Sequence, residues 1–313
     1  MIGGTGVDER PNRSEDYLSY LEIVEQVDTV FTKIRLNHFI TSNCMNSIVN
    51  KLYTLFPYFL EFVIGAKLKT YGWAKNAVDT AVLAATIASK MELSITQIYK
   101  IIQSALLHDV GMFCIPQEIL NKSASLSKME HWYILTHPVQ GYQVIERELE
   151  CFEGVAQVAL QHHESWNGAG YPKGLSGSQI DPEAQIIAIT DTFCAMISER
   201  PYRCSLGGHQ AIKTLLANNT TQFDPAIVSI FIQVMGIYPI GSLVELNNGM
   251  TAQVIAYEEG ASLFKPRLRI LSNTAGDLYD EHQTIDLVHE KGLFIKKAIA
   301  GWETFGDLEI GLI

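Results

Sequence analysis

The segment QHHESWNGAGYPKGLSG, residues 161–177, places two adjacent histidines and a glutamate directly before a glycine-rich loop. Neutral imidazole is the commonest metal ligand among side chains, and glycine permits a close backbone approach or a positive φ. The segment therefore indicates either a metal site with a substrate-binding rim or a polar surface loop. The rest of the chain decides between them.

The composition is that of a globular protein, with 47% apolar and 18% charged residues in a chain of 313. This length predicts two or three folding units, because domains cluster near roughly 100–150 residues. The formal charge of −11 argues against broad contact with nucleic-acid polymers or anionic membranes. An anionic small ligand would need a local basic site.

The cysteines and the apolar runs predict a cytoplasmic protein without a membrane segment. Five widely spaced cysteines with no Cys-x-x-Cys pair indicate neither a disulfide framework nor a thiolate zinc site. Residues 1–15 are polar and glycine-rich, so we expect a disordered start rather than a signal peptide. Pro57 and Glu61 interrupt the apolar run 52–68, which is shorter than the roughly 20 residues of a membrane span and predicts a buried helical hairpin.

Hydrophobic periodicity predicts a mainly α fold. Apolar residues recur at intervals of three and four through a helical N-terminal unit, residues 16–70, where Tyr20, Ile23 and Val27 begin one stripe. The same pattern continues through an all-helical bundle over 71–238, in which the segment 128–145 is predicted to be one helix. Short alternating runs around an Asn-Asn-Gly turn then predict a small β-rich subdomain over 239–313.

Residue types that bind metals recur at the predicted helix ends. Taken singly, each of these residues has an ordinary structural explanation; His137, for example, precedes a proline and fits a loop residue. Asp191, however, lies in the apolar segment QIIAITDTFCAM, where an unpaired ionised carboxylate would be costly. Together the set predicts a metal centre: His108, Asp109, His137, His162, His163 and Asp191.

This ligand set narrows the chemistry. Nitrogen and oxygen ligands without thiolate favour iron, manganese or zinc, and the small number of carboxylates argues against calcium. Two metal ions about 3.5–4 Å apart, bridged by Asp109, would stabilise the attacking and leaving oxygens of a phosphodiester together. Phosphodiester hydrolysis is therefore chemically reasonable for this chain.

The motifs LLHDVGMFCIP, THPVQGY, HHESWNGAGYPKGLSG, DTF and RPYR resemble the HD-GYP domain, a subclass of the HD metal-dependent phosphohydrolases, over roughly residues 70–235. The resemblance implies a bacterial cytoplasmic enzyme that hydrolyses cyclic di-GMP to pGpG or GMP at two divalent metal ions, with iron favoured. The six residues above would be the ligands, and His108 and Asp109 would also be catalytic.

The resemblance also implies substrate contacts and partners. Arg200 and Arg203 would contact the ligand phosphates, for which a guanidinium fork is suited, and Tyr171 would contact substrate from the loop. The same loop implies a diguanylate cyclase (GGDEF) domain as a partner. The N-terminal helices would either form a homodimer or pack on their own chain.

Departures from the family pattern predict a weakened enzyme. Asn76 stands in place of a further metal-binding histidine, Gly72 in place of a glutamate of three-metal members, and Met112 in place of a lysine. An amide is a poorer ligand than imidazole, and methionine cannot stabilise an oxyanion. Ser165 replaces a frequent arginine, and Cys194 replaces an aspartate and is expected to be buried and inert.

Three functional hypotheses remain open. The first is a cyclic di-GMP phosphodiesterase with a two-metal site and reduced activity. The second is a degenerate member that binds cyclic di-GMP or a protein partner without hydrolysis. The third is a phosphohydrolase of a related cyclic or linear dinucleotide, because the loops carry no legible code for base recognition.

Overall fold

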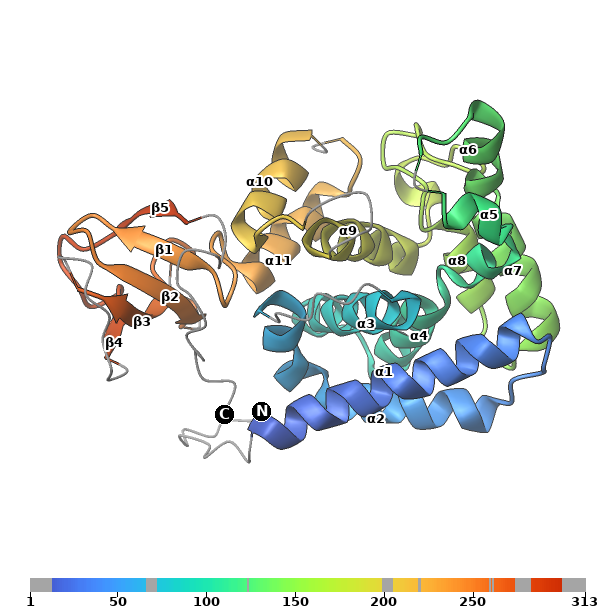
Figure 1. Cartoon of the computed structure of the whole chain (residues 1–313), viewed down its shortest axis with the longest axis horizontal. Helices are drawn as coiled ribbons and strands as arrows, with labels where there is room; N and C mark the ends of the chain where they lie inside the picture. Colours follow the sequence, from blue (N-terminus) through green and yellow to red (C-terminus); the bar gives the residue numbers. More distant parts are fainter. Residues whose placement is uncertain are drawn as a thin grey trace.

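The structure, a computed structural model, describes residues 13–65, 72–122, 124–198, 205–218, 221–258, 260, 262–273 and 283–299. Eleven α-helices in this part of the chain precede a five-stranded sheet (Figure 1). The predicted mainly α fold with a small β-rich C-terminal part is confirmed. The helices are α1 Arg13–Arg35, α2 Ser42–Gly65, α3 Trp73–Lys90, α4 Ile95–Leu107, α5 Gln117–Leu120, α6 Lys128–Leu135, α7 His137–Glu148, α8 Val155–Gln161, α9 Pro182–Ile197, α10 Gly208–Asn218 and α11 Pro225–Met235, with short 3-10 helices η1 Val110–Cys114 and η2 Gly177–Gln179.

Helix α3 is the central element of the bundle. It packs against α4, α1, α2 and α9, and its sequence is rich in alanine, which lets these neighbours approach closely. A helix that is covered on all sides carries few polar residues unless they have partners. Asn76 and Asp79 are nevertheless buried in α3, and both bear on the site described below.

The N-terminal helices α1 and α2 share one continuous hydrophobic core with the bundle. The apolar stripe of α1 that includes Tyr20, Ile23 and Val27 is buried in this core. Within the described part of the apolar run, residues 52–65, the expected hairpin is absent, because α2 continues through Pro57 as one helix. That proline is exposed, so it disturbs no core packing.

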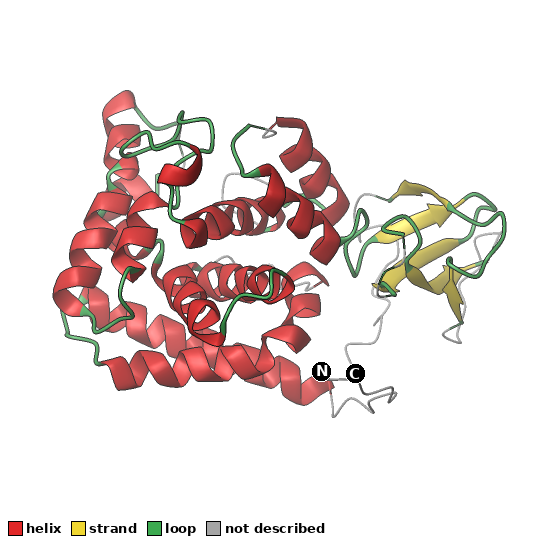
Figure 2. Cartoon of the chain, turned by 180° about the vertical axis from the view of Figure 1, so that it is seen from behind, coloured by secondary structure: helices red, strands yellow, loops and turns green. Residues whose placement is uncertain are grey.

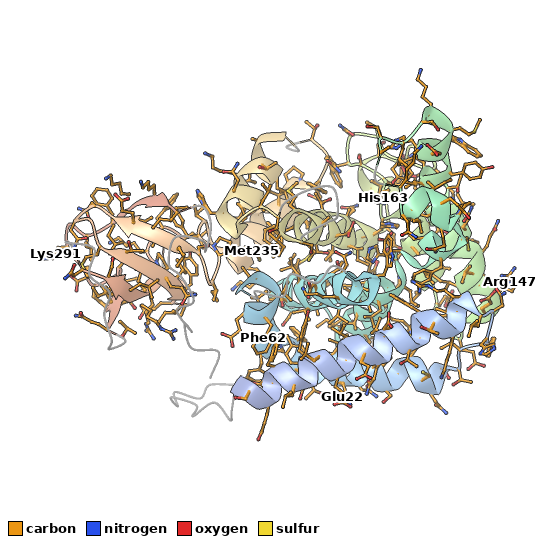
Figure 3. All side chains as sticks on the ribbon, viewed as in Figure 1. Glu22, Phe62, Arg147, His163, Met235 and Lys291 are labelled. Carbon is orange, nitrogen blue, oxygen red and sulfur yellow. The ribbon has the colours of Figure 1, made fainter. Side chains whose placement is uncertain are left out.

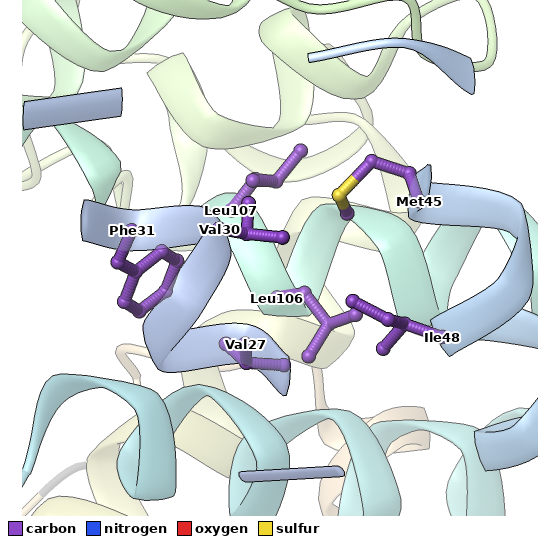
Figure 4. A pocket seen from close by; sticks show the side chains of 7 residues that line it. All are labelled: Val27, Val30, Phe31, Met45, Ile48, Leu106 and Leu107. Carbon is purple, nitrogen blue, oxygen red and sulfur yellow. The ribbon is translucent and has the colours of Figure 1, made fainter. Parts of the chain in front are cut away.

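A small apolar gap between α1, α2 and α4 leaves no room for a water molecule (Figure 4). It is lined by Val27, Val30, Phe31, Met45, Ile48, Leu106 and Leu107. It is an imperfection of packing and not a ligand site. Within the described residues, no helix is both long enough and apolar enough to cross a bilayer.

The periodic segment 128–145 divides into two helices rather than one. Helix α6 ends at Leu135, and α7 begins at His137. Pro138 has no N–H group to donate to the carbonyl of Ile134, so the helical hydrogen-bond ladder is interrupted there. The interruption places His137 at a helix boundary, where Nδ1 of its ring lies within hydrogen-bond distance of the carbonyl oxygen of Ile134.

The C-terminal strands, drawn in yellow in Figure 2, form an antiparallel sheet in the order β4-β3-β2-β1-β5. Their bounds are β1 Leu243–Leu246, β2 Thr251–Ala256, β3 Arg267–Ser272, β4 Thr284–Asp286 and β5 Ile295–Ala298. The sheet has a hydrophobic core separate from that of the bundle. At the junction, the ring of His209 stacks on Tyr238, and Gly236 with φ of 68° packs closely on Tyr257.

Candidate metal centre

The six residues predicted as metal ligands lie together at the ends of α4, α7 and α8 and in the middle of α9. His163, one of them, lies between Met235, which is near the sheet, and Arg147, which is at the opposite end of the bundle (Figure 3). These residues form two groups. Within each group, every member offers one ligand atom, and these atoms all lie within 4.8 Å of one another. The first group is Asp109, His137, His162 and His163; the second group is His108, Asp109 and Asp191.

Three of the histidines have the same ring orientation because each occupies a helix boundary. The Nδ1 atoms of His108, His137 and His162 each lie 2.7 Å from the backbone oxygen three residues earlier. A carbonyl can only accept, so Nδ1 carries the proton in each ring. The carbonyls belong to terminal turns, where intrahelical donors run out. The Nε2 lone pairs are therefore left for a ligand.

Asp109 lies between the two groups and faces each with a different oxygen. Its Oδ1 is 3.2 Å from Nε2 of His137 and 3.7 Å from Nε2 of His162. Its Oδ2 is 3.4 Å from Nε2 of His108, and that nitrogen is also 3.5 Å from Oδ1 of Asp191. A carboxylate in this position is suited to bridge two cations.

Two features show that a cation fits this cluster. Nε2 of His137 and Nε2 of His162 are 3.3 Å apart. With both protons on Nδ1, two lone pairs face one another, and a cation would remove this repulsion. In addition, the buried Nε2 of His108 makes no hydrogen bond within the described part of the chain. Such an unpaired buried polar atom is costly unless it binds a ligand.

The electrostatics favour ionised aspartates beside neutral imidazoles. Burial raises the pKa of Asp109, but His108 and the other nearby histidines outweigh it and leave that pKa well below its usual value. Burial also raises the pKa of Asp191, but His108 outweighs this effect and lowers that pKa to about 2. Burial and the neighbouring rings lower the pKa of both His162 and His163.

The pKa of His108 shifts in the opposite direction. Burial lowers it, but Asp109 and Asp191 outweigh the burial and leave it well above its usual value. In the absence of any other cation, a proton on His108 is thus what balances the two carboxylates. A divalent ion bound at the same nitrogen would take over this role.

The departures from the family pattern have different surroundings. Nδ2 of Asn76 donates to Oδ1 of Asp191 at 3.2 Å, so this amide belongs to the edge of the cluster. Met112 is buried in η1, and Gly72 immediately precedes α3. Cys194 is fully buried, and burial raises its pKa well above the usual value, which favours the expected inert thiol.

Glu164 fixes the glycine-rich loop rather than facing the histidines. Its side chain is 3% exposed, and it accepts from the N–H groups of Lys173 at 2.7 Å and Leu175 at 2.9 Å. A Cβ on Gly170 would lie 2.3 Å from the nitrogen of Ser165, so only glycine fits at this crossing. This role of Glu164 is not among the predictions made from the sequence, although a carboxylate before a glycine-rich run of backbone N–H groups is a usable signal.

Gly111 has a comparable function on the other side of the centre. A Cβ there would lie 2.0 Å from the backbone oxygen of His137 and 2.5 Å from the nitrogen of Gly141. The start of α7 can therefore approach η1 closely enough to bring His137 to Asp109. This spacing explains the glycines in HDVG and HPVQG in physical terms.

The predicted substrate-contact residues are only partly described. The ring of Tyr171 stacks on His163, with centroids 4.8 Å apart and an interplanar angle of 26°. Burial raises the pKa of Tyr171 above its usual value, so the hydroxyl stays protonated at neutral pH. Arg200 and Arg203 lie outside the described residues.

A helical bundle with two adjoining His/Asp ligand groups that share one carboxylate defines a candidate metal-dependent hydrolase. The chain belongs to the HD domain family, which matches residues 65–227. A second match, to the KOW domain associated with HD domain, covers residues 243–306 and includes the sheet. The predicted resemblance to HD-GYP proteins is confirmed.

Curated relatives support this assignment. Over 215 residues the chain is 32% identical to Cyclic di-GMP phosphodiesterase PA4108 of Pseudomonas aeruginosa. The aligned region covers 68% of this chain and 51% of that protein. Over 147 residues it is 37% identical to Cyclic di-GMP phosphodiesterase response regulator RpfG of Xanthomonas campestris pv. campestris, covering 47% and 39%. The chain thus spans about half or less of the length of these relatives.

A solved structure supports the fold. Bd1817, a HDG"Y"P protein from Bdellovibrio bacteriovorus, superposes with a TM-score of 0.56 at 17% sequence identity. The superposition covers 73% of this chain and 74% of that chain. At this identity the likeness concerns the architecture alone.

Proposed function

We propose that the chain is a metal-dependent phosphodiesterase that hydrolyses cyclic di-GMP to pGpG or GMP. The observation that carries this proposal is the position of Asp109 between two ligand groups, in which His108, His137 and His162 present Nε2. The names of the relatives, which are cyclic di-GMP phosphodiesterases, support the substrate. The separation of the groups by one carboxylate is suited to a pair of ions acting on a single phosphodiester.

The two groups would hold one divalent ion each. His137, His162 and His163 would hold the first ion with Asp109, and His108 and Asp191 would hold the second with the same carboxylate. We propose iron, with manganese or zinc as alternatives, because the donors are imidazole nitrogens and carboxylate oxygens. When bound, the ions would neutralise phosphate charge and activate water.

The surrounding residues would orient the substrate and the ligands. Each Nδ1–H bond to a backbone carbonyl holds its imidazole ring, and Glu164 holds the loop that bears Tyr171. Tyr171 covers one face of His163 and so shields it from water. We further propose that Arg200 and Arg203 contact the phosphates of the dianionic substrate.

A non-hydrolytic binding module is the second candidate. Met112 is buried and offers no charge to the substrate, and Asn76 contacts Asp191 through a donor rather than a lone pair. Both observations favour reduced activity. A related dinucleotide remains an alternative substrate, because another relative is named 3'3'-cGAMP-specific phosphodiesterase 3 of Vibrio cholerae, 30% identical over 53% of this chain and 36% of that protein.

Partners and location follow the same reasoning. We propose a cytoplasmic protein whose glycine-rich loop around Tyr171 contacts a GGDEF domain. A homodimer through the N-terminal helices would have to use the outer face of α1, where Leu18 and Leu21 are exposed. The inner stripe of α1 is already buried in its own chain.

Metal analysis of protein purified without chelator, combined with product detection from cyclic di-GMP, tests the proposal. Two metal ions per chain and the appearance of pGpG are expected. Fewer than one ion per chain would overturn the two-metal site. Two ions without product would favour the binding module, and a double replacement, Asn76→His with Met112→Lys, should then raise hydrolysis if only catalysis is impaired.

A further inference from the structure

Asn76 is buried where three structural elements meet. Its side chain, 4% exposed, projects from the first turn of α3 and donates Nδ2–H to Oδ1 of Asp191 on α9. The same oxygen of Asp191 is 3.5 Å from Nε2 of His108 at the end of α4. The amide therefore contacts the second ligand group through one specific carboxylate oxygen.

The partners available to this amide determine its role. An imidazole would offer a nitrogen lone pair to a cation, whereas the Nδ2 of an amide only donates. The Oδ1 of Asn76 is buried and has no hydrogen-bond partner in the described part of the chain. Among the described residues, the hydrogen bond to Asp191 is thus the one side-chain bond that this amide makes, and it is charge-assisted.

We infer that Asn76 is a positioning residue that holds Asp191 toward His108 and thereby maintains the second ligand group. The inference rests on the proposed metal centre. It gives Asn76 a positioning role, whereas Asn76 regarded only as the replacement of a metal-binding histidine would have no role there. Asp191 lies in the middle of a helix with only partial exposure, and removing the amide would take away the hydrogen bond that Asn76 donates to its Oδ1. The first ligand group does not include Asp191 and should be unaffected.

The test is a calorimetric titration of the full chain, stripped of metal, with Mn²⁺. In Asn76→Leu, which has a similar size but no donor, the affinity of one of the two sites should fall about 10–100-fold, as is typical for losing a group that supports a ligand. The other site should keep its affinity. Thr80→Val is the matched control, because Thr80 is buried on the same helix and belongs to neither ligand group.

The isosteric variant Asn76→Asp separates positioning from direct ligation. It keeps an oxygen but loses the donor and adds a negative charge beside Asp191, so weaker Mn²⁺ binding at the same site is expected. Tighter binding by Asn76→Asp, or unchanged binding by Asn76→Leu, would overturn the inference. A wild-type chain that binds two Mn²⁺ ions without hydrolysing cyclic di-GMP would instead count against the proposed enzyme and leave the role of Asn76 standing.

Discussion

Residues of α3 contribute to one buried polar cluster around Asp79 and contact a second, the metal centre. The two clusters differ in whether the protein's own side chains satisfy their polar atoms. At Asp79, Oδ1 accepts from the hydroxyl of Tyr20 and Oδ2 accepts from Nζ of Lys75, each at 2.5 Å. At the metal centre, the Nε2 of His108 has no hydrogen bond in the described residues, and the Nε2 lone pairs of two other histidines face one another. We call the first cluster closed, because protein side chains satisfy its carboxylate, whereas the second is suited to bind a cation.

The pKa of an aspartate is consequently raised in one cluster and lowered in the other. Burial raises the pKa of Asp79, and Lys75 and Tyr20 offset only part of this effect. At Asp109 burial acts in the same direction, but the surrounding histidines lower the pKa well below the usual value. Asp79 therefore ties α1 to α3 as a structural group, whereas Asp109 stays ionised as a ligand must.

Asp109→Asn should produce the largest effect. The amide cannot bridge two cations with two charged oxygens, so both ligand groups lose their shared member. We expect the affinity for both ions to fall by more than about 10²-fold, the upper range for losing a merely supporting group, and hydrolysis to disappear. Atomic absorption on the purified variant measures this. Retention of two ions per chain would contradict the bridging role.

Asp79→Ala should break the closed cluster instead. It leaves the amine of Lys75 and the hydroxyl of Tyr20 unpaired in the core, and breaking a buried pair in this way typically costs about 3–5 kcal/mol of unfolding free energy. Urea denaturation of the metal-free chain measures the loss, and the metal content should remain normal.

A control for Asp79→Ala lies on the surface, at an exposed ion pair that also joins α1 to a neighbouring helix. Glu22 of α1 pairs with Lys51 of α2 at 2.7 Å, and Glu22 is well exposed. Glu22→Ala should cost no more than about 1 kcal/mol, because exposed ion pairs contribute little. An equal loss in the two variants would show that Asp79 has no special structural role.

Glu164→Ala tests which of the two clusters this carboxylate resembles. Glu164 directly follows His163, yet the loop N–H groups satisfy it, as Tyr20 and Lys75 satisfy Asp79. We expect a loss of about 1.5–3 kcal/mol, the range for hydrogen bonds to a charged group, and faster proteolysis of the loop 168–176. Metal content should be unchanged, and a loss of metal comparable to that of Asp109→Asn would place Glu164 with the ligands instead.

The sequence predicted the fold class and which ligand types would meet, because histidines at helix ends leave a recognisable pattern. It did not reveal the bond between Asn76 and Asp191 or the closed cluster at Asp79. Both depend on which helices pack side by side, and a hydrophobic stripe does not specify its partner. The division between α6 and α7 was missed for a local reason: the apolar spacing continues across Pro138, while the hydrogen-bond ladder does not.

The smallest expected effect is a pH dependence that Asp79 confers and Asp79→Asn removes. The folded chain holds the Asp79 proton more tightly than the unfolded chain, whose carboxyl has a pKa of about 3.9. From about pH 4 up to the raised folded pKa, the folded state therefore binds more protons, and stability falls as the pH rises through this window. Tyr20 and Cys194, which also lie beside Asp79, stay protonated throughout this window, because burial raises the pKa of each well above its usual value.

Urea denaturation of wild type and Asp79→Asn across this window measures the difference in unfolding free energy. The wild type should lose stability relative to the variant as the pH rises, with a slope of at most about 1.4 kcal/mol per pH unit for one proton. The difference should then level off above the folded pKa. A relative gain in wild-type stability with rising pH would mean that the ion pair with Lys75 outweighs burial, and the closed cluster would then hold an ionised carboxylate, as the metal centre does.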